Sequence, residues 1–169
     1  TAGVSLDNAS LNAGIGNVLL RGQGVGNAQN FQFGTRLYGG SITGANITID
    51  AIGSIQGPSS SSWGLSLEGF SIEGTGTISL TGKGGRAGQS NSDYNQAGVE
   101  IRPALDNSSD HSQIRATGTG TIVINGQGGS GSFASHNDPN SLSAGIRIQP
   151  NQTAPILSAS GAITLNGTS

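Results

Sequence analysis

The stretch that decides the fold is Gly118-Thr119-Gly120-Thr121-Ile122-Val123-Ile124-Asn125-Gly126-Gln127-Gly128-Gly129. An earlier copy of it reads Gly74-Thr75-Gly76-Thr77-Ile78-Ser79-Leu80-Thr81-Gly82-Lys83-Gly84-Gly85. A short alternating aliphatic run between glycine clusters is typical of a half-buried β-strand. Its recurrence at a fixed place in a longer pattern predicts a repeat protein.

Working outward from these two stretches, the repeat contains three kinds of strand. The first kind has glycine as its second residue, as in Ala97-Gly98-Val99-Glu100-Ile101, and its five copies begin at residues 2, 33, 63, 97 and 144. The second kind is centred on Leu11, Ile42, Ile72, Ile114 and Leu157. The third kind, which includes the aliphatic runs quoted above, begins at residues 17, 46, 77, 121 and 162. The three kinds always follow one another in the same order, which predicts five successive turns.

The composition agrees with an ordered chain made only of strands and turns. Gly, Ser, Asn and Thr make up 81 of the 169 residues, and charged residues only 9%, with a formal net charge of -2. Low charge combined with alternating aliphatic runs argues against disorder. The lack of clustered basic residues excludes a nucleic-acid partner, and no apolar run is long enough to insert into a membrane. Cysteine is absent, so disulfides and cysteine metal sites are excluded.

A strand of four or five residues cannot bury its apolar face alone, so the repeats must stack. Each strand then pairs in parallel with its copy one turn later, about 4.8 Å away. Crossovers between parallel strands are right-handed in nearly all proteins. The sequence therefore predicts an all-β fold, a right-handed, three-sided parallel β-helix (β-solenoid) of about five stacked turns. Val99 and Ile101 should face the core, whereas Ser66, Glu100 and Arg147 should point outward. Several glycines should turn corners with positive φ: Gly74, Gly76, Gly82, Gly84, Gly85, Gly118 and Gly120.

The two quoted stretches and the Ala-Gly-aliphatic segments after them resemble the passenger repeats of filamentous-haemagglutinin-like exoproteins and autotransporters. These are bacterial adhesin-type β-helices. The resemblance covers almost the whole chain, and it implies a secreted or outer-surface location on a bacterium. It brings no catalytic motif, so we expect no enzyme activity and no cofactor. Because the chain enters directly at a first-type strand, we expect residues 1–169 to be a single β-helix segment of a longer repeat protein, which continues into further repeats.

The carboxylates and histidines are the side chains that could carry chemistry. Glu100 should form a cross-strand ion pair with Arg147, a structural role that we favour over catalysis. Asp106, Asp110 and His111 fit a solvated turn better than a calcium loop or an acid–base pair. Phe133 stands where the calcium-binding nonapeptide repeat has Asp, so no metal site is expected.

The lengths of the turns point to a binding surface. Extra residues fall in two places in the later turns, between the third strand and the next first strand (86–96 and 130–143) and after the first strand (103–112 and 150–155). Insertions in solenoids map to one face, often the binding one. We therefore expect the first pair to stack as a lobe that contacts a glycan or cell-surface receptor, through residues with polar or aromatic side chains: Arg86, Asp93, Tyr94, Phe133, His136 and Asp138.

Three functions remain open at this point. The leading one is a non-enzymatic repeat segment of a secreted or cell-surface adhesin-like protein, a rigid stalk with displayed loops. A carbohydrate-binding or carbohydrate-cleaving β-helix is the alternative, which an outward acidic cluster or aromatic platform would favour. An ice-binding solenoid is the lesser alternative, but its threonine row, with Thr77 and Thr121, is broken by Asn17, Asn46 and Ala162.

Overall fold

The structure is a computed structural model. It describes residues 1–25, 31–55, 61–86, 96–104, 112–130, 143–149 and 157–169. Within these ranges every regular element is a β-strand, and no helix suited to crossing a membrane occurs. The strands are β1 (Ala2–Asp7), β2 (Ser10–Asn12), β3 (Val18–Gln23), β4 (Gln32–Gly44), β5 (Ile47–Ile52), β6 (Ser62–Gly74), β7 (Ile78–Lys83), β8 (Val99–Arg102), β9 (Gln113–Ala116), β10 (Ile122–Gln127), β11 (Ile146–Ile148), β12 (Leu157–Ala159) and β13 (Ile163–Thr168).

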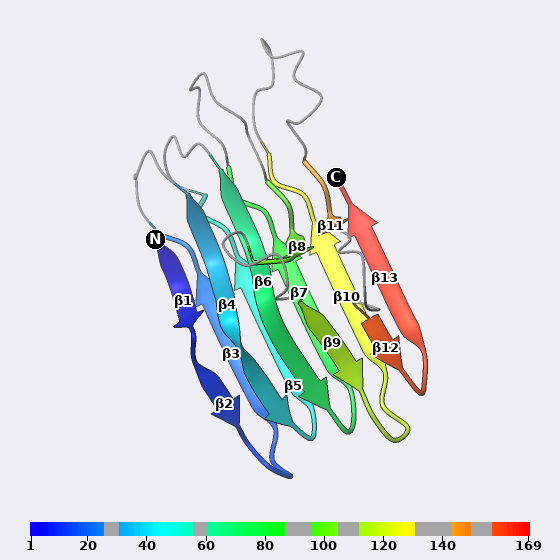
Figure 1. Cartoon of the computed structure of the whole chain (residues 1–169). Coiled ribbons are helices and arrows are strands. Elements are labelled where there is room, and N and C mark those ends of the chain that lie inside the picture. Colours follow the sequence, from blue (N-terminus) through cyan, green and yellow to red (C-terminus); the bar gives the residue numbers. More distant parts are fainter. Residues whose placement is uncertain (26–30, 56–60, 87–95, 105–111, 131–142, 150–156) are drawn as a thin grey trace.

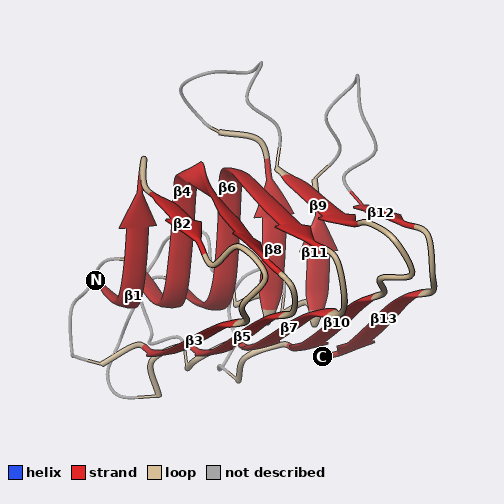
Figure 2. Cartoon of the chain, turned by 90° about the horizontal axis from the view of Figure 1, so that it is seen from below, coloured by secondary structure: helices blue, strands red, loops and turns tan. Residues whose placement is uncertain are grey.

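These strands form two parallel sheets. The first sheet has eight strands and follows the order β1-β4-β6-β8-β11, with β2, β9 and β12 joined to it. The second sheet has five strands in the order β3-β5-β7-β10-β13. Figures 1 and 2 show the strands of each sheet side by side, with the second sheet as a separate layer. The all-β, parallel architecture expected from the sequence is thus confirmed.

The register between turns follows the sequence repeat. Val4 pairs with Thr35, Thr35 with Leu65, Leu65 with Val99, and Val99 with Ile146. The second kind of strand pairs at Leu11, Ile42, Ile72, Ile114 and Leu157, as expected. The third kind pairs at Val18, Ile47, Ile78, Ile122 and Ile163. All five turns therefore share one register, although the later turns contain more residues.

The first and second kinds of strand are continuous in two turns, where the sequence had suggested separate strands. Each of β4 and β6 covers both kinds within 13 residues. A positive φ falls inside each of them, 52° at Gly39 and 58° at Gly69. Asn8, which precedes β2 in the first turn, has a φ of 49°. Asp7, Tyr38 and Glu68 pair with one another across the strands. Asn8, Gly39 and Gly69 directly follow them, so the three residues with positive φ occupy equivalent positions in successive turns. In β4 and β6 the chain thus changes direction at this point, and the two strands stay paired on both sides of it.

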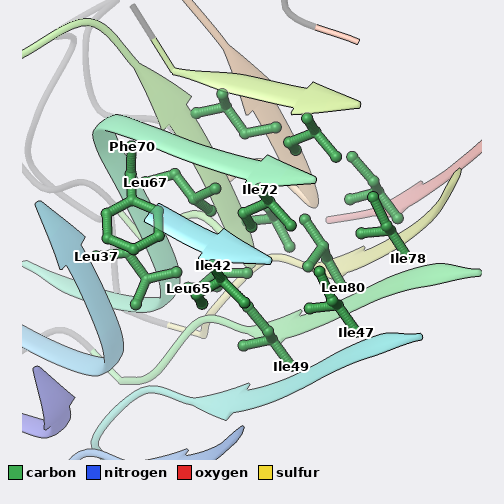
Figure 3. Close-up of a cluster of buried hydrophobic side chains, with 14 of the residues drawn as sticks. Leu37, Ile42, Ile47, Ile49, Leu65, Leu67, Phe70, Ile72, Ile78 and Leu80 are labelled. Carbon is green, nitrogen blue, oxygen red and sulfur yellow. The ribbon is translucent and has the colours of Figure 1, made fainter. Parts of the chain in front are cut away.

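The core is a narrow column of aliphatic side chains between the sheets (Figure 3). In the third turn Leu65, Leu67, Ile72, Ile78 and Leu80 are all fully buried. Leu65 and Leu67 come from the first kind of strand, Ile72 from the second, and Ile78 and Leu80 from the third. All three kinds of strand in this turn therefore contribute side chains to the core. Burial of these residues alternates with half-buried positions along β7 and β10, as the period of two requires.

Most of the repeated glycines allow two backbones to pack closely against each other, and few of them have a positive φ. Of the seven glycines expected to have positive φ, only Gly118 does, at 64°. A separate set, which we call the glycine column, occupies the second residue of each first-type strand: Gly3, Gly34, Gly64, Gly98 and Gly145. A Cβ at Gly64 would collide with the backbone nitrogen of Lys83 in the second sheet. The other four meet second-sheet backbone in the same way. The two sheets therefore touch backbone to backbone along the glycine column.

This contact predicts that Gly64→Ala destabilises the fold by roughly 1–3 kcal/mol or more, as overpacking in a well-packed interior does. Gly167→Ala is the matched control, because a Cβ there finds its nearest atom at 3.5 Å. The control should change the free energy of unfolding by no more than about 0.5 kcal/mol. Denaturant unfolding of both variants checks the difference. Equal effects would mean that the glycine column does not set the sheet spacing.

Candidate functional site

The displayed-loop residues proposed from the sequence fall mostly outside the described residues. Asp93, Tyr94, Phe133, His136 and Asp138 lie there, as do Asp106, Asp110 and His111. Arg86 is described: its exposed side chain follows β7, and its backbone nitrogen donates to the oxygen of Ser54 at 2.8 Å. Of the six proposed residues, the structure therefore describes Arg86 alone.

The described residues that flank the insertions 87–95 and 131–142 nevertheless lie next to each other. Arg86 and Ser130, which begin the two insertions, form a parallel bridge. At the other end, the oxygen of Gln96 accepts from the nitrogen of Gly129 at 2.8 Å, and the hydroxyl of Ser143 donates to the oxygen of Gly129 at 2.7 Å. The two insertions are therefore anchored side by side on successive turns.

The main concentration of charged side chains in the described residues lies on the first sheet. The expected ion pair is present, with Arg147 Nη1 at 3.2 Å from Glu100 Oε1. It belongs to a larger group that we call the charged belt: Arg36, Glu68, Glu100, Arg102 and Arg147. Strand pairing builds this group, because Glu100 lies beside Arg147 and Glu68 lies beside Arg102 on neighbouring strands.

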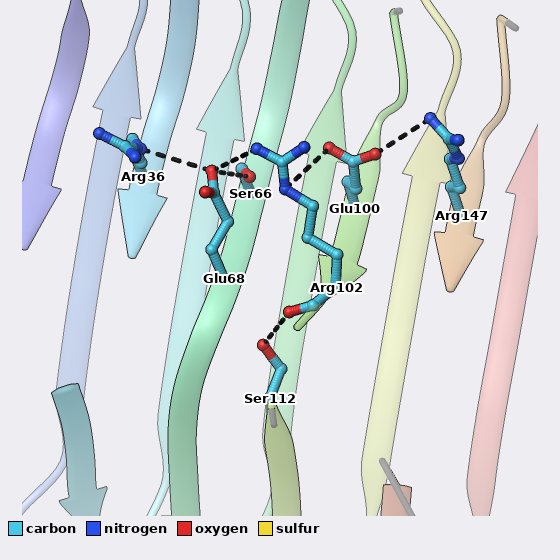
Figure 4. Close-up of polar contacts among 7 residues, drawn as sticks. All are labelled: Arg36, Ser66, Glu68, Glu100, Arg102, Ser112 and Arg147. Atoms are coloured by element: carbon cyan, nitrogen blue, oxygen red, sulfur yellow. Dashed lines mark hydrogen bonds and ion pairs between the residues drawn. The ribbon is translucent and has the colours of Figure 1, made fainter. Parts of the chain in front are cut away.

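Glu68 is the most heavily bonded member of the charged belt (Figure 4). Its Oε1 lies 2.9 Å from Arg102 Nη2 and 3.4 Å from Arg36 Nε. The same oxygen accepts a hydrogen bond from the hydroxyl of Ser66 at 3.1 Å. Arg102 reaches between the two carboxylates, with its Nε 4.0 Å from Glu100 Oε2. One arginine thus holds two glutamates from neighbouring strands.

The two carboxylates of the charged belt are buried, contrary to the expectation that outward residues meet solvent, whereas its arginines are partly exposed. The side chains of Glu68 and Glu100 are 0% and 1% exposed. Ser66 is also fully buried. The alternation of each strand does turn these residues away from the aliphatic core, but long arginine side chains pack across the carboxylates. Direction along a strand therefore does not determine exposure here.

Burial also changes the acidity of one carboxylate. Desolvation raises the pKa of Glu100 above its ordinary value of 4.5. The guanidinium groups of Arg102 and Arg147 act in the opposite direction, and the nearby Glu68 adds to the increase in pKa. Since the pKa stays raised, the loss of hydration outweighs the two ion pairs.

Aromatic side chains extend the charged belt toward the start of the strands. Phe33 and Trp63 stack with ring centroids 4.8 Å apart and planes 9° from parallel. The guanidinium carbon of Arg36 lies 5.6 Å from the ring centroid of Phe33 and 5.0 Å from that of Tyr38. Cations over aromatic faces at this distance are attracted by the ring quadrupole. Arg36 therefore joins the aromatic stack to the carboxylates.

Sequence reasoning found Glu100 and Arg147 but missed Glu68 and Arg102. The sequence does show that Glu68 and Arg102 occupy equivalent positions. Glu68 lies four residues after Gly64, and Arg102 lies four residues after Gly98, the matching glycine of the next turn. Ending the first kind of strand one residue later would have aligned the two, as the pairing of β6 with β8 does. Pairing diagonal neighbours across strands would then have shown a carboxylate pair with arginines between them.

Polar ladders occupy other rows of the stack. Thr77 and Thr121 lie 3.3 Å apart through their hydroxyl oxygens. The row continues through Asn46 and Asn17, whose side chains bond at 2.9 Å. Asparagine thus interrupts the threonine row that ice binding would need. The described residues contain no group of three side chains suited to holding a metal ion.

Comparisons of the chain with protein families, curated proteins and solved structures find no match.

The shared carboxylate predicts a large loss of stability in Glu68→Ala. Removing it takes away the carboxylate partner of Arg36 and the shorter of the two carboxylate contacts of Arg102. Breaking a buried ion pair costs roughly 3–5 kcal/mol. Glu73→Ala is the matched control, because Glu73 is 47% exposed and 4.0 Å from Arg115 on the neighbouring strand. Its effect should stay within about 1 kcal/mol. Chemical denaturation of both variants tests this; a small effect at Glu68 would show that the charged belt is not a stabilising network.

The raised pKa of Glu100 predicts a particular pH dependence. The folded state holds the Glu100 proton more tightly than the unfolded state does, so this residue favours folding most below pH 4.5. Its contribution is lost as the pH rises through its raised, folded-state value. Glu100→Gln should flatten the pH dependence of the unfolding free energy above 4.5. Unfolding curves across this range measure it, and an unchanged slope in the variant would contradict the assignment.

Proposed function

We propose that this chain is a non-enzymatic repeat segment of a secreted or cell-surface adhesin-like protein on the outside of a bacterium. It acts as a rigid stalk that displays loops to a glycan or a cell-surface receptor. In this proposal the five turns form a closed, three-sided, right-handed β-helix. The chain is one segment of a longer protein with further repeats of the same kind.

The repeated change of direction supports the three-sided form. Asn8, Gly39 and Gly69 put a corner between the first and second kinds of strand, and the third kind lies in a separate sheet. Three strand directions per turn are what a triangular coil requires. The right hand is proposed on the general preference of parallel crossovers.

The observation that carries the stalk proposal is the single register that runs through all five turns. Counted from Val18 through Ile47, Ile78 and Ile122 to Ile163, successive turns contain 29, 31, 44 and 41 residues. The longer turns keep the same strand pairing as the shorter ones. A scaffold that holds its register while insertions change length is suited to presenting variable loops.

The burial of the two carboxylates in the charged belt also supports a structural role. A carboxylate that acts on a substrate must come within hydrogen-bond reach of it. Glu68 and Glu100 are covered and bonded to arginines from their own and neighbouring strands. Their arrangement fits a role in holding adjacent turns together on the face opposite the core.

A carbohydrate-binding or carbohydrate-cleaving β-helix is the second candidate. The charged belt favours it, because it places an acidic pair beside arginines, next to the stacked rings of Phe33 and Trp63. Each glutamate also has an Oε2 that accepts no hydrogen bond from the described residues. Sugar hydroxyls are donors of the kind that such an oxygen accepts.

Exchange of the first pair of insertions tests the leading proposal. Residues 87–95 and 131–142 are replaced by short Gly-Asn turns, while the anchors Arg86, Gln96, Ser130 and Ser143 are kept. We expect the circular dichroism spectrum and thermal unfolding to be retained, and binding of the chain to a printed glycan array and to cultured cells to be lost.

Two results would count against this proposal. Binding that survives the exchange but is lost in Glu68→Gln would place the contact on the charged belt. Release of new reducing ends from a polysaccharide panel by the original chain, but not by Glu100→Gln, would establish the carbohydrate-cleaving candidate instead. The control variant Glu73→Gln should behave as the original chain in both assays.

A further inference from the structure

The corner between the first and second kinds of strand is built in the same way in the three early turns. The corner residue has a positive φ, which is 49° at Asn8, 52° at Gly39 and 58° at Gly69. Glycine and asparagine are the residues that adopt this left-handed conformation most readily. One such residue is enough for β4 and β6 to pass through the corner as single long strands (Figure 1).

The two later turns have proline at the same position. Glu68 pairs with Arg102 in the next turn. Pro103 therefore stands where Gly69 stands one turn earlier. Pro150 holds this position in the sequence of the fifth turn and lies outside the described residues. The proline ring fixes φ at about −65°, so proline cannot adopt the conformation of this corner. These two turns are the ones that contain extra residues after the first strand.

The base of the insertion in the fourth turn is closed by a serine. The hydroxyl of Ser112 donates to the backbone oxygen of Arg102 at 2.8 Å, which joins the two ends of the insertion (Figure 4). The same hydroxyl oxygen accepts from the backbone nitrogen of Phe70 on β6 at 3.3 Å. Ser112 is buried. It therefore ties both ends of the insertion to each other and to the preceding turn.

The strand pairing shows that the ends of this insertion are as close as those of the short corner. Both β8 and β9 pair with the continuous strand β6. Arg102 and Gln113, the paired residues on either side of the insertion, are separated by ten residues in the chain. Their partners on β6, Glu68 and Ser71, are separated by only two. Eight residues of the fourth turn are therefore additional to what the scaffold needs at this corner.

We propose that this corner is a second insertion site of the scaffold, and that its corner residue determines whether a turn carries an insertion there. A residue that adopts a positive φ lets the first strand continue directly into the second. Proline prevents this and requires additional residues, which remain separable from the scaffold. This inference goes beyond the proposed function, because it concerns the second pair of insertions and does not depend on what any insertion binds.

Two shortened chains test the proposal. In both, residues 104–111 are removed, so that residue 103 alone joins Arg102 to Ser112. One of them also carries Pro103→Gly and should unfold within about 3 °C of the original chain, because glycine can adopt the positive φ and a shorter turn changes the closure entropy little. The other keeps Pro103 and should unfold about 5 °C or more below its glycine counterpart, because proline cannot form the corner.

A second pair of variants tests the corner in a turn that has no insertion there. Gly39→Pro should lower the unfolding temperature by about 5 °C or more, since proline cannot adopt the φ of 52° at this position. Gly39→Asn is the matched control, because asparagine forms the same corner in the first turn at Asn8. A Cβ at Gly39 meets the side chain of Asn8, which can turn aside. The control should therefore stay within about 3 °C of the original chain.

Thermal unfolding followed by circular dichroism measures all four variants. Equal unfolding temperatures in the two shortened chains, or two shortened chains that both fail to fold, would overturn the proposal. A shortened Pro103→Gly chain that unfolds well below the original chain would also overturn it, since the insertion would then be part of the scaffold. So would a Gly39→Pro chain that is as stable as Gly39→Asn, because the corner would then accept proline without extra residues.

Discussion

The contact between backbones along the glycine column governs the rest of this structure. Without side chains at Gly3, Gly34, Gly64, Gly98 and Gly145, the first sheet approaches the backbone of the second within van der Waals distance. The separation of the sheets at this line fixes how wide the aliphatic column beside it can be. Leu, Ile, Val and Ala make up this column in the described residues, with Phe70 as its one aromatic member. The second sheet is less strict, since Ala51 stands in line with Gly22 and Gly82.

The outward face of the first sheet must avoid repulsion between like charges on paired strands. A parallel ladder brings equivalent residues of successive turns close together, so a repeated charge would repel its own copies. Here the rows vary in sign from turn to turn, with Arg36, Ser66, Glu100 and Arg147 in one row. The core-facing row of the first strands is therefore aliphatic apart from Thr35, whereas the outward row changes in charge from turn to turn. Desolvation of Glu100 is the cost of that arrangement.

Sequence alone predicted the strands, their parallel pairing and their register, because each depends on a period of two and a repeat that are visible in the letters. The roles of the glycines were predicted less well, because the residue type alone does not tell a turn with positive φ from a close contact between backbones. Gly118 has a positive φ, whereas Gly64 faces the backbone of the second sheet. Sequence analysis predicted only the Glu100–Arg147 ion pair of the charged belt. Glu100 and Arg147 lie in one row, but Glu68 and Arg102 required the strand to end one residue later. Burial of these charges depends on how arginine side chains lie across the sheet, which no periodic pattern records.

The unequal lengths of the turns have a consequence for how the chain folds. Every contact between neighbouring turns joins residues separated by one turn, so the entropy of closing that loop must be lost before any pairing is gained. This entropy grows only with the logarithm of loop length, and lengthening a turn from 31 to 44 residues adds roughly 0.3 kcal/mol. Folding that starts between any two turns can therefore propagate through short and long turns at nearly equal cost. Changes in insertion length then add little to the entropy lost on pairing, so the inserted segments can vary in length at small cost to the stability of the stack.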